Sequence, residues 1–141
     1  MADTMPARRH PHQVFLSLLC ILAGLPILFG GPRPGSLSAA LPGWLLAVWS
    51  VTLVTGGSFL IAAAVTRSII RALYLEAVAH LPLAFMTLAY ASALLGVIGV
   101  PAWSSALIVL AFGCASAVRA FQVARTLRGL TRAVRKQVGE T

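Results

Sequence analysis

A carboxylate and an imidazole lie four residues apart in the stretch LYLEAVAHLP, which covers residues 73–82. The chain has three acidic residues, and Glu76 is the only one far from the ends, where Asp3 and Glu140 lie. Residues four apart share one face of a helix, so Glu76 and a protonated His80 could pair there. Such a couple could transfer protons or hold an ion. It could instead mark a membrane edge, where Glu76 neutralises an arginine.

Other motifs of catalysis and ligand binding are absent from the sequence. It contains no HExxH, GxGxxG, GxxxxGK[ST] or CxxC motif, and no second acid that could complete a catalytic dyad. Cys20 and Cys114 fall in separate apolar runs without metal-ligand spacing, so we expect two buried free thiols. We therefore expect a protein that is not an enzyme and that uses no metal and no cofactor.

The composition indicates an integral membrane protein. Hydrophobic residues make up 59% of the chain and charged residues 10%, whereas a soluble domain carries about 25% charged residues. Several uncharged apolar runs approach about 20 residues, the length needed to cross a bilayer. A chain of 141 residues leaves no room for a separate soluble domain beside these runs.

We expect an all-α fold with four transmembrane helices in two antiparallel hairpins, followed by a basic amphipathic helix. The Gly- and Pro-rich segment 31–35 breaks the chain after the first span, and Pro101 makes a tight turn before the last. Residues 77–118 contain no charged residue and are too many for one span. The expected spans are 14–30, 42–65, 72–100 and 103–122. They form a transmembrane domain of residues 13–124, between a cytoplasmic segment at 1–12 and a basic cytoplasmic tail at 125–141.

The positions of Lys and Arg predict the orientation. Of the 11 basic residues, all but Arg33 lie before the first span, between the second and third, or at the end of the fourth and beyond. Cytoplasmic segments carry the excess of Lys and Arg, so we expect a multi-pass inner (plasma) membrane protein with both termini in the cytoplasm. The apolar stretch after Arg8 and Arg9 also resembles a signal peptide. The small residues Ser38, Ala39 and Ala40 lie too far beyond it for a cleavage site.

The uncharged run after His80 sets the depth of Glu76. That run is about 20 residues long and can cross the bilayer alone, so Glu76 and His80 lie at the inner boundary. Folding the last hairpin about its turn places Glu76 level with about Arg125. The same count places His80 level with about Gln122, and Arg119 nearly one turn deeper. We expect these five residues to form a structural polar cluster in which Glu76 neutralises Arg119 or Arg125. A proton or ion site and a solvated Glu76 are the alternatives.

Two tryptophans follow similar tripeptide patterns at the expected outer surface. Trp44 is the third residue of Pro42-Gly43-Trp44, and Trp103 is the third residue of Pro101-Ala102-Trp103. Tryptophan anchors helices at the membrane interface, so we expect both as interface anchors. The repeat could reflect a duplication, or only the preference of outer helix starts for Pro and Trp.

Arginines of the tail recur at three- and four-residue steps opposite a row of apolar residues. This pattern predicts a basic amphipathic helix that binds anionic phospholipids of the inner leaflet. The expected contacts are Arg128, Arg132, Arg135 and Lys136. Alternatively, the tail only enforces topology and solubility. It has no aromatic residue after Phe121 to stack on bases, so we expect no specific nucleic-acid partner.

With these residues placed, the chain resembles the small four-span membrane proteins encoded by actinobacteria and their phages. The resemblance covers about Ser36 to Arg128. It rests on Leu41-Pro42-Gly43-Trp44, Gly56-Gly57, Leu75-Glu76, Tyr90-Ala91 and the pattern Arg119…Gln122…Arg125. Such proteins are mostly known only as membrane proteins, so the resemblance implies a location rather than a mechanism. A phage origin would favour a holin-like role.

Small residues within the spans predict close helix packing and association in the membrane. They are Gly24, Gly56, Gly57, Ser58, Gly96, Gly99 and Gly113 with Ala117. The leading hypothesis is a holin-like pore or membrane scaffold that acts by oligomerisation, as a homo-oligomer or with a membrane partner. One alternative is a small transporter or transporter subunit that uses Glu76 and His80 for proton coupling. Another is a scaffold that recruits a cytoplasmic partner through its tail.

Overall fold

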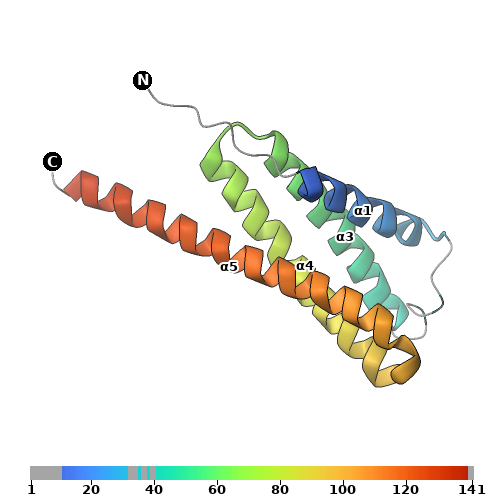
Figure 1. Ribbon diagram of the computed structural model, residues 1–141. Coiled ribbons are helices and arrows are strands. Elements are labelled where there is room, and N and C mark those ends of the chain that lie inside the picture. The colour runs from blue at the N-terminus through green and yellow to red at the C-terminus, as the bar shows by residue number, and fades with distance from the viewer. Residues whose placement is uncertain (1–10, 32–34, 36–37, 39–40, 140–141) are drawn as a thin grey trace.

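The computed structural model describes residues 11–31, 35, 38 and 41–139. The main α-helices of these residues are α1 (Pro11–Leu28), α3 (Gly43–Val65), α4 (Ile69–Val97) and α5 (Trp103–Gly139), as Figure 1 shows. A short 3-10 helix, η1 (Val100–Ala102), joins α4 to α5. No strand occurs among the described residues, which confirms the all-α prediction. The basic residues Arg8, Arg9 and Arg33 lie outside the described part of the chain.

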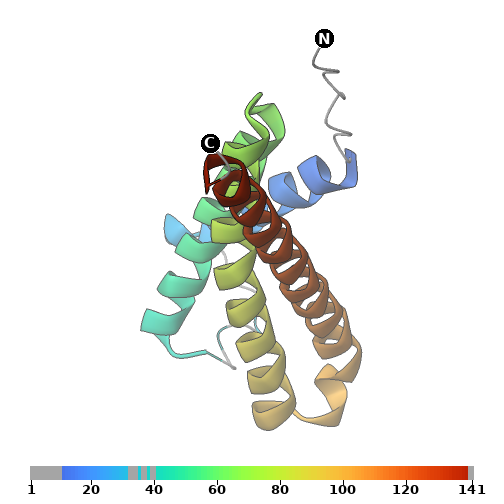
Figure 2. The same ribbon diagram turned by 90° about the vertical axis from the view of Figure 1, so that its left-hand side faces the viewer.

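In the described part of the chain, three helices are long and apolar enough to cross a membrane: Gly43–Val65, Ile69–Val97 and the segment that begins at Val100. They make this a membrane-embedded protein. The remaining helix, α1, has 18 residues and a shorter apolar part, Gln13–Leu28. Its length of about 27 Å is slightly less than the hydrocarbon thickness of about 30 Å. In Figure 2, α1 is also inclined to the other three helices.

The helices pack in the order of the chain. Helix α1 contacts α3, α3 contacts α4, and α4 contacts α5; within the described residues no other two α-helices meet. Consecutive helices run in opposite directions (Figures 1 and 2), so α1–α3 and α4–α5 form two hairpins that meet along α3 and α4. The protein is therefore an open row of helices and not a closed four-helix bundle.

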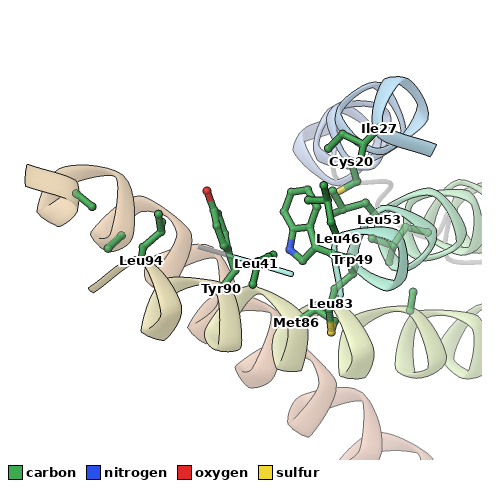
Figure 3. Packing of buried hydrophobic residues seen from close by; sticks show 14 residues of the cluster. Cys20, Ile27, Leu41, Leu46, Trp49, Leu53, Leu83, Met86, Tyr90 and Leu94 are labelled. Atoms are coloured by element: carbon green, nitrogen blue, oxygen red, sulfur yellow. The ribbon is translucent and has the colours of Figure 1, made fainter. Parts of the chain in front are cut away.

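The core lies mainly between α3 and α4, with contributions from α1. Figure 3 shows its centre, where the rings of Trp49 and Tyr90 pack with their centroids 5.5 Å apart and tilted by 59°. Leu83 and Leu94 of α4 have no exposed surface. Outside this core, many large apolar side chains are exposed. That distribution suits helices whose outer faces meet lipid rather than water.

Glycine allows the backbones of α1 and α3 to approach closely. A Cβ atom on Gly57 would lie 2.6 Å from the carbonyl oxygen of Ser17, and one on Gly24 would lie 2.8 Å from that of Ser50. Small residues at helix contacts permit this packing in membranes, as the sequence predicted for both glycines.

The other two helix contacts each contain one such glycine. A Cβ on Gly56 would lie 2.8 Å from Cγ of Leu83, at the α3–α4 contact. A Cβ on Gly113 would lie 2.8 Å from Oγ1 of Thr87, at the α4–α5 contact. Gly96 and Gly99 have no atom within 4 Å of a Cβ, and Ser58 is exposed, so the prediction of close packing is wrong for them.

Two glycines with positive φ end helices earlier than the sequence predicted. Gly30 has φ +74°, and the N–H of Gly31 donates to the carbonyl of Pro26 at 2.6 Å, which closes α1 after Leu28. Gly99 has φ +72° and donates its N–H to Leu94 at 3.3 Å. Because of this turn, α4 ends at Val97 instead of residue 100.

Helix α5 runs without a break from the apolar span into the basic tail. It has 37 residues, or about 55 Å at 1.5 Å per residue. The fourth span and the basic amphipathic helix that the sequence predicts thus belong to one helix. No proline occurs after Pro101 to interrupt the helix, and a single glycine such as Gly129 is tolerated inside one. Figure 1 shows α5 continuing past the first turns of α4.

Candidate functional site

The contact between α4 and α5 positions the polar residues of the candidate site. Ala106, Gly113 and Val123 recur along one face of α5, and all three are buried. Steps of three and four residues keep such positions on one side of a helix, so this face of α5 is the one that packs on α4. Its small members bring the two backbones close together. Side chains at the edge of this contact can therefore reach from one helix to the other.

Arg119 of α5 forms an ion pair with Glu76 of α4. Its Nε and Nη2 atoms donate to Oε2 of Glu76 at 3.1 and 2.7 Å. The side chain of Glu76 is 13% exposed and that of Arg119 is 39% exposed. Of the two arginines proposed from the sequence, the structure joins Arg119 to Glu76. Two charge-assisted hydrogen bonds therefore join α4 and α5 at the edge of their contact.

The register of the hairpin shows how Arg119 reaches this partner. Gly113 lies against Thr87 and Leu88, which agrees with a hairpin folded near residue 100. Arg119 follows Gly113 by six residues, but Glu76 precedes Thr87 by eleven. The difference of five residues corresponds to about 7 Å of helix. The arginine side chain must therefore extend toward the end of the hairpin where the other arginines lie, as a long cationic side chain near hydrocarbon tends to do.

His80 lies beside this ion pair but does not join it. Its ring is partly buried, and its Nδ1 atom is buried without a hydrogen-bond partner among the described residues. It lies close enough to Glu76 and Arg119 for both charges to act on it. Arg119 binds Oε2 of Glu76, and no hydrogen bond joins His80 to this carboxylate among the described residues. The pairing of Glu76 with His80 that their spacing allows is thus replaced by a pairing across the hairpin.

Gln122 and Arg125 lie apart from the pair. Both are exposed, and Cζ of Arg125 lies 5.7 Å from the ring centroid of Phe121 on the same helix. By helical spacing they face away from the side of α5 that packs on α4. The five-residue cluster expected from the sequence is therefore reduced to Glu76 and Arg119, with His80 as a neighbour.

The residues expected at the membrane surfaces are exposed wherever they are described. Trp44 is 70% exposed in the first turn of α3, and Trp103 is 56% exposed at the start of α5. Arg128 and Arg132 are exposed on the extension of α5. Arg135 and Lys136 belong to α5, but their side chains lie outside the described part of the structure. Large exposed indoles at helix starts have the placement of interface anchors.

A groove that was not predicted from the sequence lies between the start of α4 and the extension of α5. Its lining comes from both helices and consists of Tyr74, Ala124, Leu127, Arg128, Thr131 and Arg132. Two signals in the sequence point toward it. Tyr74 lies close to Glu76, at the expected membrane boundary, and Arg128 and Arg132 are four residues apart. Neither signal shows that α5 continues far enough to place them together.

The two cysteines have different environments. Cys20 is buried against α3, as predicted, whereas Cys114 is exposed on α5. The prediction of a buried thiol is therefore wrong for Cys114, because it lies on a side of α5 that has no neighbouring helix. Within the described residues, no group of three or more His, Cys, Asp and Glu side chains could hold a metal ion.

No family model, curated protein or solved structure matches the chain. The resemblance to small four-span proteins of actinobacteria and their phages therefore rests on the short patterns in the sequence. What the arrangement can do must be inferred from its own geometry. It offers an ion pair that joins two helices, an unpartnered imidazole nitrogen, an uncovered helix face and a basic groove.

Proposed function

We propose that the protein is a non-enzymatic, four-span protein of the inner membrane that acts by oligomerisation, as a holin-like pore or a membrane scaffold. The observation that carries this proposal is the outer face of α5, which bears small residues in the middle of the span. Ala111 and Ala115 are four residues apart there, and both are exposed. Small residues at this spacing let a second helix approach closely.

The other small residues named from the sequence do not compete for this role. Gly24, Gly56, Gly57 and Gly113 are each in close contact within the chain, so they hold one molecule together. The outer face of α5 meets no other helix in the described part of the chain. We assign it to a second copy of the protein. A two-fold contact would place the same small residues of both copies together.

The proposed topology places both termini and the α3–α4 connection in the cytoplasm. Exposed Arg67 and Arg71 lie at that connection, and the basic extension of α5 leaves the membrane on the same side. The close contact of Gly57 with Ser17 supports α1 as a fourth span, because it ties α1 to the middle of a spanning helix. The two exposed tryptophans would then anchor the opposite surface.

A cross-linking experiment on the native cysteines tests the association. Oxidising membranes that contain the full chain should yield a disulfide-linked dimer through Cys114, which lies between the two exposed alanines on the uncovered side of α5. Cys20 is buried and serves as the internal control. We expect the dimer to persist in Cys20→Ser and to vanish in Cys114→Ser.

A matched pair of substitutions shows whether the small residues make the contact. Ala115→Leu should block the cross-link, because the larger side chain keeps the second helix away. Ala47→Leu makes the same change at an exposed position of α3 and should leave the cross-link intact. A protein that stays monomeric without these substitutions, or a dimer that persists in Ala115→Leu, would refute the proposed contact.

Expression in cells separates the pore from the scaffold. A holin-like pore should collapse the membrane potential abruptly, and Ala115→Leu should prevent the collapse together with the cross-link. If the cross-link forms and the potential stays normal, the scaffold is the correct form of the proposal.

A second candidate function is proton-coupled transport, favoured by the buried, unpartnered Nδ1 atom of His80 beside the Glu76–Arg119 pair. Vesicles that contain the purified protein would then show a pH-dependent flux that Glu76→Gln abolishes while insertion stays normal. An unchanged flux in that variant, or no flux in the native protein, would exclude this candidate.

A further inference from the structure

We infer that the groove between the start of α4 and the extension of α5 binds the headgroup of an anionic phospholipid. The inference goes beyond the proposed association and does not need it. It rests on the placement of α4 and α5 in a membrane. The groove is lined by Tyr74 from α4 and by five residues of α5, namely Ala124, Leu127, Arg128, Thr131 and Arg132.

The groove forms where α4 and α5 separate near the start of α4. The side of α5 that packs on α4 includes Gly113 and Val123, and steps of three and four residues continue it through Ala124, Leu127 and Thr131. Figure 1 shows α4 and α5 diverging toward this end of the hairpin, so this side of α5 is no longer in close contact with α4 there. The lining thus combines the end of the helix contact with the part of α5 that has separated from α4.

The depth of the groove matches the headgroup layer. The uncharged run of about 20 residues after His80 is enough to fill the hydrocarbon region. Tyr74 lies outside that region, two turns of helix before the run begins, and tyrosine is enriched at membrane interfaces. The ion pair of Glu76 with Arg119 lies at the same boundary, with both side chains partly exposed.

The side chains of the groove have the chemistry of a phosphodiester site. Arg128 and Arg132 are four residues apart and therefore lie on one side of α5. Two guanidinium groups offer paired N–H donors that match the geometry of a phosphate. The phenol of Tyr74 can donate to the headgroup. The hydroxyl of Thr131 donates to the carbonyl of Leu127 at 2.9 Å, so it does not donate to the phosphate, but its oxygen can accept from a hydroxyl of the headgroup.

The apolar part of the lining favours a lipid over a soluble phosphate. Ala124 and Leu127 form a surface that continues toward the membrane, where the glycerol and the first methylenes of a lipid would lie. Among the residues that the structure describes, no acidic side chain lines the groove. A lipid therefore satisfies both the charge and the apolar surface, whereas inorganic phosphate would satisfy only the charge.

Native mass spectrometry of the full chain in neutral detergent tests this site. We expect phosphatidylglycerol to bind and phosphatidylcholine not to bind at the same concentration. The double variant Arg128→Gln/Arg132→Gln should bind phosphatidylglycerol at least about tenfold more weakly. The variant Arg128→Lys/Arg132→Lys keeps the charge and should still lose about threefold, because lysine lacks the two-donor fork.

The matched control is Arg67→Gln/Arg125→Gln, which removes the same charge from exposed positions outside the groove. It should bind phosphatidylglycerol like the native protein. If it binds as weakly as the glutamine variant of the groove, diffuse charge explains the affinity and the site is refuted. Displacement of the lipid by an equal concentration of glycerol 3-phosphate would refute a lipid occupant. The Cys114 cross-link provides a separate readout, so loss of association and loss of lipid binding can be told apart.

Discussion

The pair of Glu76 and Arg119 joins opposite charges at the edge of the contact between α4 and α5. Breaking such a pair costs more than the pair contributes, because the remaining charge keeps its desolvation penalty without a partner. Glu76 is mostly covered, whereas Arg119 is more open to water. An arginine left alone can turn outward, but a glutamate left alone cannot leave the helix contact as easily.

This asymmetry gives the first prediction. We expect Arg119→Gln to lower the free energy of unfolding of the α4–α5 hairpin by about 2 kcal/mol, and Glu76→Gln by about 1 kcal/mol. Denaturation of the purified protein in detergent, followed by circular dichroism, measures both. Adding Glu76→Gln to Arg119→Gln should restore part of the loss. Arg125→Gln is the control and should change stability by less than about 0.5 kcal/mol. Equal losses in all three single variants would contradict the assignment.

The sequence predicted an arginine of the last helix as the partner of Glu76, but not which one. Counting residues about the turn compares backbone levels, and by that count Arg125 is the nearer. The contact depends instead on which side of α5 a residue occupies and how far its side chain extends. Arg119 lies beside the face that packs on α4, whereas Arg125 points away from it. The groove was not predicted for a related reason. It forms where α4 and α5 separate, and the sequence does not show that position.

Helix contacts depend on a few glycines that no other residue can replace without moving a backbone. A Cβ at Gly57 would meet the carbonyl of Ser17, which cannot rotate away. The side-chain atoms near Gly113 can adjust more easily. A larger residue in place of glycine is therefore tolerated less at the α1–α3 contact than at the α4–α5 contact.

The second prediction compares Gly57→Ala with Gly96→Ala. The first should destabilise the α1–α3 hairpin by about 2 kcal/mol, because α1 and α3 must move apart. The second should be neutral or stabilising by up to about 1 kcal/mol, because nothing lies near a Cβ there and alanine favours a helix. Thermal unfolding in detergent distinguishes them. A loss of equal size in both variants would show that the close contact of Gly57 with Ser17 does not control the stability of this hairpin.

The third prediction concerns the extension of α5. Gly129 lies inside the helix with open space around it. We expect Gly129→Ala to slow amide hydrogen exchange of residues 125–135 by up to about fivefold, since alanine stabilises an exposed helix by up to about 1 kcal/mol. Gly129→Pro should speed exchange there and leave the apolar part of α5 unchanged. An extension that exchanges freely in the native protein would contradict a continuous helix.

The helix boundaries show which parts of the secondary structure the sequence predicts and which it does not. Hydrophobic runs located α3 to within a residue, and the start of α5 at Trp103 agreed as well. The sequence predicted the last span and the basic amphipathic helix as two elements, and the structure joins them in α5, because the drop in hydrophobicity near residue 122 does not interrupt the backbone hydrogen bonding. A helix ends where the backbone is interrupted, as at Gly30 and Gly99.

The whole molecule has a topology that labelling can test, and this is the fourth prediction. In a chain with Cys20 and Cys114 replaced by serine, a cysteine at Val100 should react with a membrane-impermeant maleimide in intact cells. A cysteine at Arg67 should react only after permeabilisation. Val100 is 85% exposed in the turn between α4 and α5, which makes it a sensitive reporter.

An N-terminal tag decides whether α1 crosses the membrane. With four spans the tag stays in the cytoplasm and is protected in intact cells. If α1 instead lies on the outer surface, the tag becomes accessible outside while the labels at residues 67 and 100 remain unchanged. That result would correct the number of spans without changing the orientation of α3, α4 and α5.

The open row of helices has a consequence for how the chain is made. Within the described residues, each α-helix contacts only the α-helices before and after it, so its earlier partner is already synthesised when it enters the membrane. Folding can follow translation one helix at a time, with few distant segments to wait for. A nascent chain stalled after α3 should already contain the finished α1–α3 pair. Helix α5 emerges last, and its Arg119 completes the ion pair with Glu76. The charge of Glu76 is therefore neutralised only at the end of synthesis.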